Sequence, residues 1–120
     1  VMQTLKTFAN DQKLAASHFT AIGAFSEATI AYFDWNKKAY QDIRIDEQVE
    51  VLMLAGDVAE KDAKPAIHAH VVLGLSTGHT RGGHLRSAIV RPTLELILTE
   101  SPAHLKKKLD PETGLALISL

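Results

Sequence analysis

The sequence predicts a single domain of the α/β (α+β) class, with a largely antiparallel β-sheet and one flanking N-terminal helix. The chain has 120 residues, which is enough for one domain with a core but not for two. Most of it divides into short β-prone runs separated by polar or glycine-containing breaks. Short gaps between consecutive strands favour antiparallel pairing. Helical spacing of apolar residues is clear only at the start of the chain.

The first residues predict the helix. Val1, Leu5 and Phe8 follow one another at i, i+4 and i+7, which places them on one helical face. We expect the helix to continue to about Leu14, with polar side chains on its exposed side. Because the chain begins within this pattern rather than at a methionine, we expect that residues before Val1 are missing.

A series of short strands follows the helix. They are predicted over residues 18–24, 26–34, 40–45, 49–58, 65–73, 84–91, 93–100 and 115–120. The run over 49–58 is almost continuously apolar and is predicted to be buried on both faces. Residues 75–83 contain three glycines and are predicted to form a loop. Ser101-Pro102 is predicted to begin one helical turn or a loop that runs through Lys106–Lys108.

Composition excludes several classes of protein. There is no cysteine, so disulfides and thiolate zinc sites are impossible. No apolar run approaches the ~20 residues that span a bilayer, and no secretory signal opens the chain, so we expect no membrane partner and a cytoplasmic location. The formal net charge of −1 argues against a strong general attraction to nucleic acid or to an anionic membrane.

Histidine spacing indicates a candidate metal site. Residues 65–73 alternate as a strand, so His68 and His70 share one face, and His84 follows after 13 intervening residues. Three convergent neutral imidazoles can hold zinc or another divalent transition metal while leaving one position open. Gly82 and Gly83 would allow positive φ or a close backbone approach before His84. The alternative is that these histidines are ordinary polar residues on a wet surface.

Three further residues are candidates for a role beside such a metal. Glu95 could act as a general base or orient a ligand, although an exposed or ion-paired glutamate is the common alternative. Arg86 could bind an anionic substrate, and His79 could be a fourth ligand or part of a lid; both are otherwise ordinary surface residues. The sequence contains no nucleophile motif, P-loop or dinucleotide-binding glycine pattern.

Several segments, taken in order, resemble the plants-and-prokaryotes-conserved (PPC) domain. They are Ala21-Ile22-Gly23-Ala24-Phe25, Glu47-Gln48-Val49-Glu50-Val51-Leu52, Pro65-Ala66-Ile67-His68-Ala69-His70, Gly82-Gly83-His84-Leu85, Pro92-Thr93-Leu94-Glu95 and Asp110-Pro111-Glu112-Thr113-Gly114-Leu115. The resemblance covers essentially the whole chain. It implies an antiparallel sheet with a flanking helix, a homotrimer, and an ion held by His68, His70 and His84. The family usually has a strand before its first helix, which we expect to lie before Val1.

The same resemblance raises DNA binding as an alternative. Plant relatives carry AT-hooks and act on AT-rich DNA, whereas stand-alone prokaryotic relatives are called DNA-binding by analogy. An AT-hook needs an Arg-Gly-Arg-Pro core, and this chain has only Arg81-Gly82-Gly83. Phosphate contacts need clustered lysine and arginine, and Lys106–Lys108 is the only such cluster. We therefore expect direct DNA binding to be weak.

Together these patterns predict one PPC-like domain over residues 1–120. We expect a homotrimer with a histidine-based metal site, serving as a binding or regulatory module of unassigned ligand, for which a small molecule is one candidate. A DNA-binding protein and a metal-dependent hydrolase or lyase are the alternatives, and whether the protein is an enzyme stays open.

Overall fold

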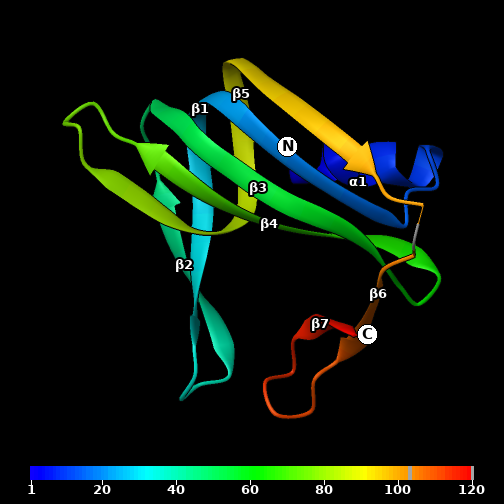
Figure 1. Cartoon of the computed structure of the whole chain (residues 1–120). Coiled ribbons are helices and arrows are strands. Elements are labelled where there is room, and N and C mark those ends of the chain that lie inside the picture. The colour runs from blue at the N-terminus through cyan, green and yellow to red at the C-terminus, as the bar shows by residue number, and fades with distance from the viewer. Residues whose placement is uncertain (103, 120) are drawn as a thin grey trace.

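The fold is described from a computed structural model of the chain, which describes residues 1–102 and 104–119. These residues form one helix and a seven-stranded sheet (Figure 1). The elements are α1 (Met2–Asp11), β1 (Ala16–Asp34), β2 (Ala39–Ile45), β3 (Val49–Lys61), β4 (Lys64–Gly74), β5 (Thr80–Glu100), β6 (Lys106–Leu109) and β7 (Ala116–Ser119). The predicted combination of one short N-terminal helix with a sheet is therefore confirmed.

The sheet is mostly antiparallel, as predicted. Its strand order is β2-β1-β5-β4-β3-β6-β7, and β1 also pairs with β3. Strands β1, β5, β4 and β3 therefore close on themselves through four antiparallel pairings. The single parallel pairing among the described strands joins β3 to β6 at Glu60 and Lys106. The β6–β7 hairpin consequently lies beside the closed part of the sheet rather than within it (Figure 1).

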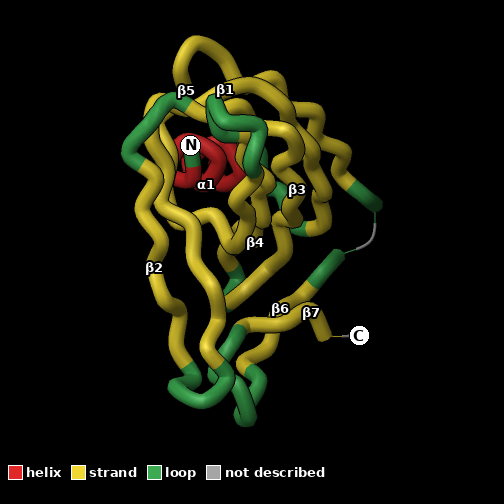
Figure 2. The backbone as a smooth tube through the Cα atoms, turned by 90° about the vertical axis from the view of Figure 1, so that its left-hand side faces the viewer, coloured by secondary structure: helices red, strands yellow, loops and turns green. Residues whose placement is uncertain are grey.

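The helix lies inside the curve of the sheet (Figure 2). Ala9 is its buried residue and joins a core that includes Phe19, Phe25, Leu54 and Leu85, each 0–1% exposed. The helix ends at Asp11 rather than near Leu14 as predicted. Lys13 has φ 54°, and a residue in this left-handed region cannot continue a right-handed helix.

Two pairs of predicted strands are in fact single long strands. Residues 18–24 and 26–34 both belong to β1, which changes register near Gly23 instead of ending there. Gly23 has φ +152°, and a Cβ at this position would lie 2.2 Å from the Thr93 carbonyl oxygen of β5. The glycine thus marks a close approach of two strands. Similarly, residues 84–91 and 93–100 both belong to β5, which contains the cis peptide bond before Pro92.

The loop predicted over residues 75–83 is shorter than expected. Strand β5 already begins at Thr80 because residues 80–84 pair with β4. The prediction that 49–58 is buried on both faces is also wrong. Val51 and Leu54 are 2% and 0% exposed, whereas Leu52 and Met53 are 50% and 47% exposed. Strand β3 has a core on one side only, so apolar content alone overstated its burial.

The lysine cluster near the C-terminus forms a strand rather than the predicted helical turn or loop. Lys106–Leu109 pairs antiparallel with Ala116–Ser119, around the predicted turn at 110–114. Asp110 accepts hydrogen bonds from the backbone and side chain of Thr113 within that turn. The predicted helical turn also included Ala103, and the predicted final strand included Leu120; both lie outside the described residues.

A carboxylate at the end of β5 stabilises the beginning of β1 through hydrogen bonds. Glu100 accepts hydrogen bonds from the backbone N–H groups of Ala15 and Ala16, at 3.0 and 3.1 Å, and from the Ser17 hydroxyl. Burial acts to raise the pKa of Glu100, but these hydrogen bonds outweigh it and hold the pKa below its ordinary value of 4.5. The stabilisation is therefore present above pH 4.5 and is lost as the pH falls below it.

Glu100→Gln is accordingly expected to lower the free energy of unfolding by about 1 kcal/mol at pH 7. The difference from the unmodified protein should shrink as the pH falls below 4.5, because both chains then carry an uncharged group. Urea denaturation at pH 7 and pH 3.5 measures both values. A difference that stays constant between the two pH values would contradict a role for the charged form.

Candidate metal centre

The three predicted histidines converge on one face of the sheet. His68 and His70 lie on β4, and His84 lies on β5 directly opposite His70 in the strand register. The intervening Ala69 and the following Val71 are buried in the core on the other face. The alternation of β4 therefore sends both of its imidazoles away from the helix, as the period of a strand requires.

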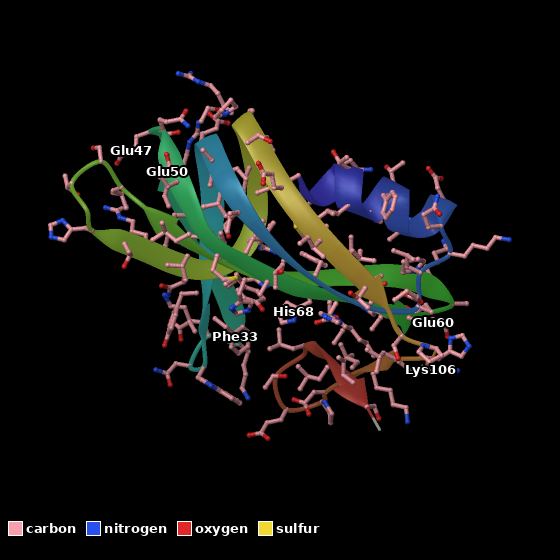
Figure 3. The ribbon with its side chains drawn as sticks, turned by 45° about the horizontal axis from the view of Figure 1, so that its top comes forward. Phe33, Glu47, Glu50, Glu60, His68 and Lys106 are labelled. Atoms are coloured by element: carbon pink, nitrogen blue, oxygen red, sulfur yellow. The ribbon has the colours of Figure 1, made fainter. Side chains whose placement is uncertain are left out.

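The imidazole rings are close enough to share one ion. Their centroids are 4.9 Å apart for His68 and His70, 5.1 Å for His68 and His84, and 5.5 Å for His70 and His84. The Nε2 atoms of His68 and His70 are 3.1 Å apart. One ligand nitrogen from each residue lies within 4.8 Å of the others. Figure 3 shows His68 beneath the sheet, between Phe33 and Lys106 in that view.

The glycines before His84 act through space rather than through backbone conformation. A Cβ on Gly83 would lie 2.7 Å from the Ala31 carbonyl oxygen of β1, and one on Gly82 would lie 3.0 Å from the Val71 carbonyl oxygen of β4. Neither glycine has positive φ. Of the two possibilities raised by the sequence, close approach is the one that the structure uses. It lets β1 and β4 flank β5 tightly beside His84.

A carboxylate stands behind His68. Asp57 of β3 pairs with His68 in the strand register, and its Oδ2 atom lies 3.6 Å from His68 Nδ1. Its Oδ1 atom lies 2.7 Å from the Nζ atom of Lys107, whose side chain is only 4% exposed. Burial acts to raise the pKa of Asp57, but its interactions with His68 and with the Lys107 ammonium outweigh burial, so the pKa is lowered. Asp57 is therefore placed beside His68 Nδ1 as a carboxylate partner of a metal-binding histidine would be, which leaves Nε2 free to face the other rings.

Burial is the main factor that lowers the pKa values of His70 and His84. Burial, followed by the charge of His68, lowers the pKa of His70. Burial, followed by the charges of His68 and His70, lowers the pKa of His84 to about 4. Neutral imidazole is the form that binds a metal. The Nδ1 atom of His84 is buried and has no hydrogen-bond partner among the described residues. A buried polar atom without a partner destabilises the folded protein, and an ion bound by the three histidines would offset part of that destabilisation. The residues present therefore fit a divalent metal.

Two side chains extend the site toward β2. The ring of Tyr40 packs against His84 with centroids 4.7 Å apart. The guanidinium of Arg86 lies 5.2 Å from the Tyr40 ring centroid, and its Nε atom is 3.2 Å from Asp42 Oδ1. Arg86, a candidate from the sequence, thus lies at the edge of the cluster and is held there by two neighbours.

The structure does not bring the other two candidates to the cluster. His79 lies in the turn between β4 and β5, where its carbonyl accepts from Leu75 N–H and its Nδ1 is 3.2 Å from Thr77 Oγ1. Glu95 is exposed and pairs with Ile22 in the register, far along β5 from His84. The expectation that Glu95 would lie near His84 assumed a separate strand. Because β5 is continuous, Glu95 belongs to a different part of the sheet.

Sequence reasoning missed Asp57, Lys107 and Tyr40. The position of Asp57 beside His68 is predictable from the sequence in principle. A hairpin turn at residues 62–63 fixes the β3–β4 register and sets residue 57 opposite residue 68. The strands predicted over 49–58 and 65–73 stop short of this turn and therefore do not define the register. Lys107 and Tyr40 carry no comparable local signal, since each reaches the site only through tertiary packing.

The fold and the cluster define a small antiparallel β-domain with three converging histidines. The sequence profile of the Plants and Prokaryotes Conserved (PCC) domain matches residues 1–102. The chain therefore belongs to the PCC domain family, which is the family of the resemblance found from the sequence. The β6–β7 hairpin lies beyond the matched residues.

Solved structures with the same fold carry two kinds of description. A metal-containing protein from Archaeoglobus fulgidus is 37% identical, with a TM-score of 0.89 over 100% of this chain and 85% of its own. A PPC protein from Pyrococcus horikoshii is 32% identical, with a TM-score of 0.91 over 98% and 82%. A candidate DNA-binding protein from Ralstonia eutropha is 32% identical, with a TM-score of 0.91 over 100% and 83%. No curated protein sequence matches this chain significantly.

None of the helices in the described part of the chain has the length and apolar character needed to cross a membrane.

Proposed function

We propose that this protein is a metal-binding module that holds zinc or another divalent transition metal through His68, His70 and His84. The observation that carries the proposal is the convergence of three ligand nitrogens within 4.8 Å of one another. The unpaired Nδ1 of His84 and the carboxylate of Asp57 behind His68 support it. The metal-containing relative from Archaeoglobus fulgidus is consistent with it.

The surroundings favour binding over hydrolytic or lyase chemistry. A divalent ion in such a site supplies a Lewis acid with an open coordination position. The nearby carboxylate, Asp57, is already engaged by His68 and Lys107 and has a lowered pKa, so it is poorly suited to take up a proton. The cavity that His68 and His84 help to line has no carboxylate among its described lining residues. We therefore assign the protein a binding or regulatory role.

Elemental analysis tests the proposal directly. The full chain would be purified without a histidine tag and without added metal, beside a His68→Ala/His70→Ala variant. We expect about one transition-metal ion per chain, absent from the variant. Absence of metal from both proteins, even after incubation with zinc and desalting, would refute the proposal and return the histidines to the role of surface residues.

DNA binding is the second candidate, and the candidate DNA-binding protein from Ralstonia eutropha raises it. The basic cluster of this chain supports it poorly. Lys107 is buried against Asp57, and Lys106 Nζ lies 3.7 Å from Glu60 Oε1. Phosphate contacts need free cationic side chains, and two of the three lysines are already paired. A duplex affinity that falls steeply with salt and is lost on neutralising Lys108 would favour this candidate.

We also propose that the protein is a homotrimer, and an exposed apolar patch supports self-association. Ile97, Ile22 and Met53 are 76%, 57% and 47% exposed and line one shallow hollow on β1, β3 and β5. Contiguous apolar surface of this kind is typical of protein interfaces. Ile97 lies near the end of β5 that is farthest from His84 and pairs with Thr20 of β1, so its substitution can test assembly separately from metal binding.

Ile97→Glu is expected to convert the trimer to a monomer, because a charge in a desolvated interface has no compensating partner. Size-exclusion chromatography with light scattering measures the mass, and we expect a threefold fall. The matched control is Ile118→Glu, which changes an apolar side chain that is 44% exposed on β7. A monomeric unmodified protein, or an Ile97→Glu variant that stays trimeric, would contradict the assignment.

A further inference from the structure

A cavity of about 290 Å³ adjoins the histidine cluster. His68 and His84 form one side of it. The other lining residues are Tyr40, Lys61, Ala66, Ile67, Lys107, Leu115, Ala116 and Leu117. Building on the proposed metal site, we propose that this cavity binds a small organic carboxylate, with its acid group toward the histidine cluster and Lys61 and its apolar body against the C-terminal hairpin.

The charge of the lining selects an anion. Lys61 and Lys107 line the cavity, and none of its described lining residues is acidic. Asp57 lies behind His68 and balances Lys107, which leaves the charge of Lys61 unopposed within the lining. A divalent ion on the histidines would add two further positive charges. Such a surplus attracts an anionic ligand and disfavours a cationic one.

Part of the lining is apolar. Ile67 comes from β4, and Leu115 and Leu117 come from the hairpin that contains β6 and β7. Leu117 is 47% exposed, so apolar surface is available for a ligand to cover. An inorganic anion would leave this surface in water, whereas an acid with an aromatic or branched body would bury it. The combination of cationic and apolar walls therefore favours an organic acid over phosphate.

The volume of the cavity and the residues that line it restrict the class of ligand further. A volume of about 290 Å³ lies at the lower limit of small-molecule sites, which suits a compact acid rather than a nucleotide. Lys107, Leu115 and Leu117 lie beyond the part of the chain that the family profile matches, whereas Ile67 lies within it. We infer that the C-terminal hairpin determines ligand choice, while the matched residues supply the histidines.

The test uses the full chain loaded with Co²⁺, whose visible absorption reports changes in coordination. Benzoate, its neutral analogue benzamide, and inorganic phosphate would each be titrated into the loaded protein. We expect benzoate to change the Co²⁺ spectrum saturably and to bind at least about tenfold more tightly than benzamide or phosphate. Lys61→Gln should weaken benzoate binding about tenfold without changing the affinity for Co²⁺.

Lys64→Gln is the matched control. Lys64 pairs with Lys61 across the β3–β4 turn but lines a different hollow, so its loss should leave benzoate binding unchanged. Failure of the chain to bind Co²⁺ would refute the metal site and this inference together. Normal Co²⁺ binding with no response to benzoate, or with equal affinity for benzamide, would overturn the inference alone. Equal affinity for phosphate would overturn the assignment to organic acids, and an unaffected Lys61→Gln variant would overturn the assigned role of Lys61.

Discussion

Replacement of His70 by alanine is expected to abolish tight zinc binding and leave the fold unchanged. His70 faces His84 across the β4–β5 pair, and its Nε2 atom lies 3.1 Å from that of His68, so its loss removes a central member of the set. Mutation of a residue that only supports a metal ligand typically lowers metal affinity 10–100-fold, so loss of a ligand itself should lower zinc affinity at least about 100-fold. Because His70 is exposed and belongs to no part of the core, the sheet should form normally.

Competition with a chromophoric chelator measures the zinc affinity, and circular dichroism measures the fold. A ligand that binds only the folded state raises the melting temperature, so zinc should raise it for the unmodified protein and not for His70→Ala. The matched control is His79→Ala, which removes a histidine from the β4–β5 turn and should leave affinity and thermal shift unchanged. Equal zinc binding by His70→Ala and the unmodified chain would exclude the proposed set.

The part of the site that follows from local periodicity could be predicted from the sequence. The alternation of β4 fixes that His68 and His70 share a face, because neighbouring strand residues point to opposite sides. The core follows for the same reason, since Ala69 and Val71 occupy the alternate positions and are buried. His84 joins the cluster only if the chain turns back after β4. The glycine-rich segment indicates such a turn, and the antiparallel β4–β5 pairing places His84 opposite His70.

The part that depends on strand continuity and tertiary contact could not be predicted. Gly23 and Pro92 usually interrupt strands, yet here β1 and β5 continue past them, which separates Glu95 from His84. Lys107 lies in a run of three lysines, a pattern typical of a solvated face. It is buried because β6 pairs with β3 and places its ammonium against Asp57, and no local pattern carries that information.

Asp57→Asn is expected to lower both stability and metal affinity. The substitution leaves the Lys107 ammonium, 4% exposed, without its counter-charge at 2.7 Å. Removing one partner of a buried ion pair costs about 3 kcal/mol, so the urea midpoint should fall accordingly. The same change removes the carboxylate that orients His68, which should weaken zinc binding by about 10-fold or more.

A second substitution separates these two effects. In Asp57→Asn/Lys107→Met, no unpaired ammonium is buried, so most of the lost stability should return. Zinc affinity should stay low, because His68 Nδ1 still lacks its carboxylate partner. Urea denaturation of the metal-free proteins and chelator competition measure the two quantities independently. If the double variant regained zinc affinity along with stability, Asp57 would act on the metal only by keeping the fold intact. Stability that stayed low in the double variant would instead show that the buried Lys107 charge is not the source of the loss.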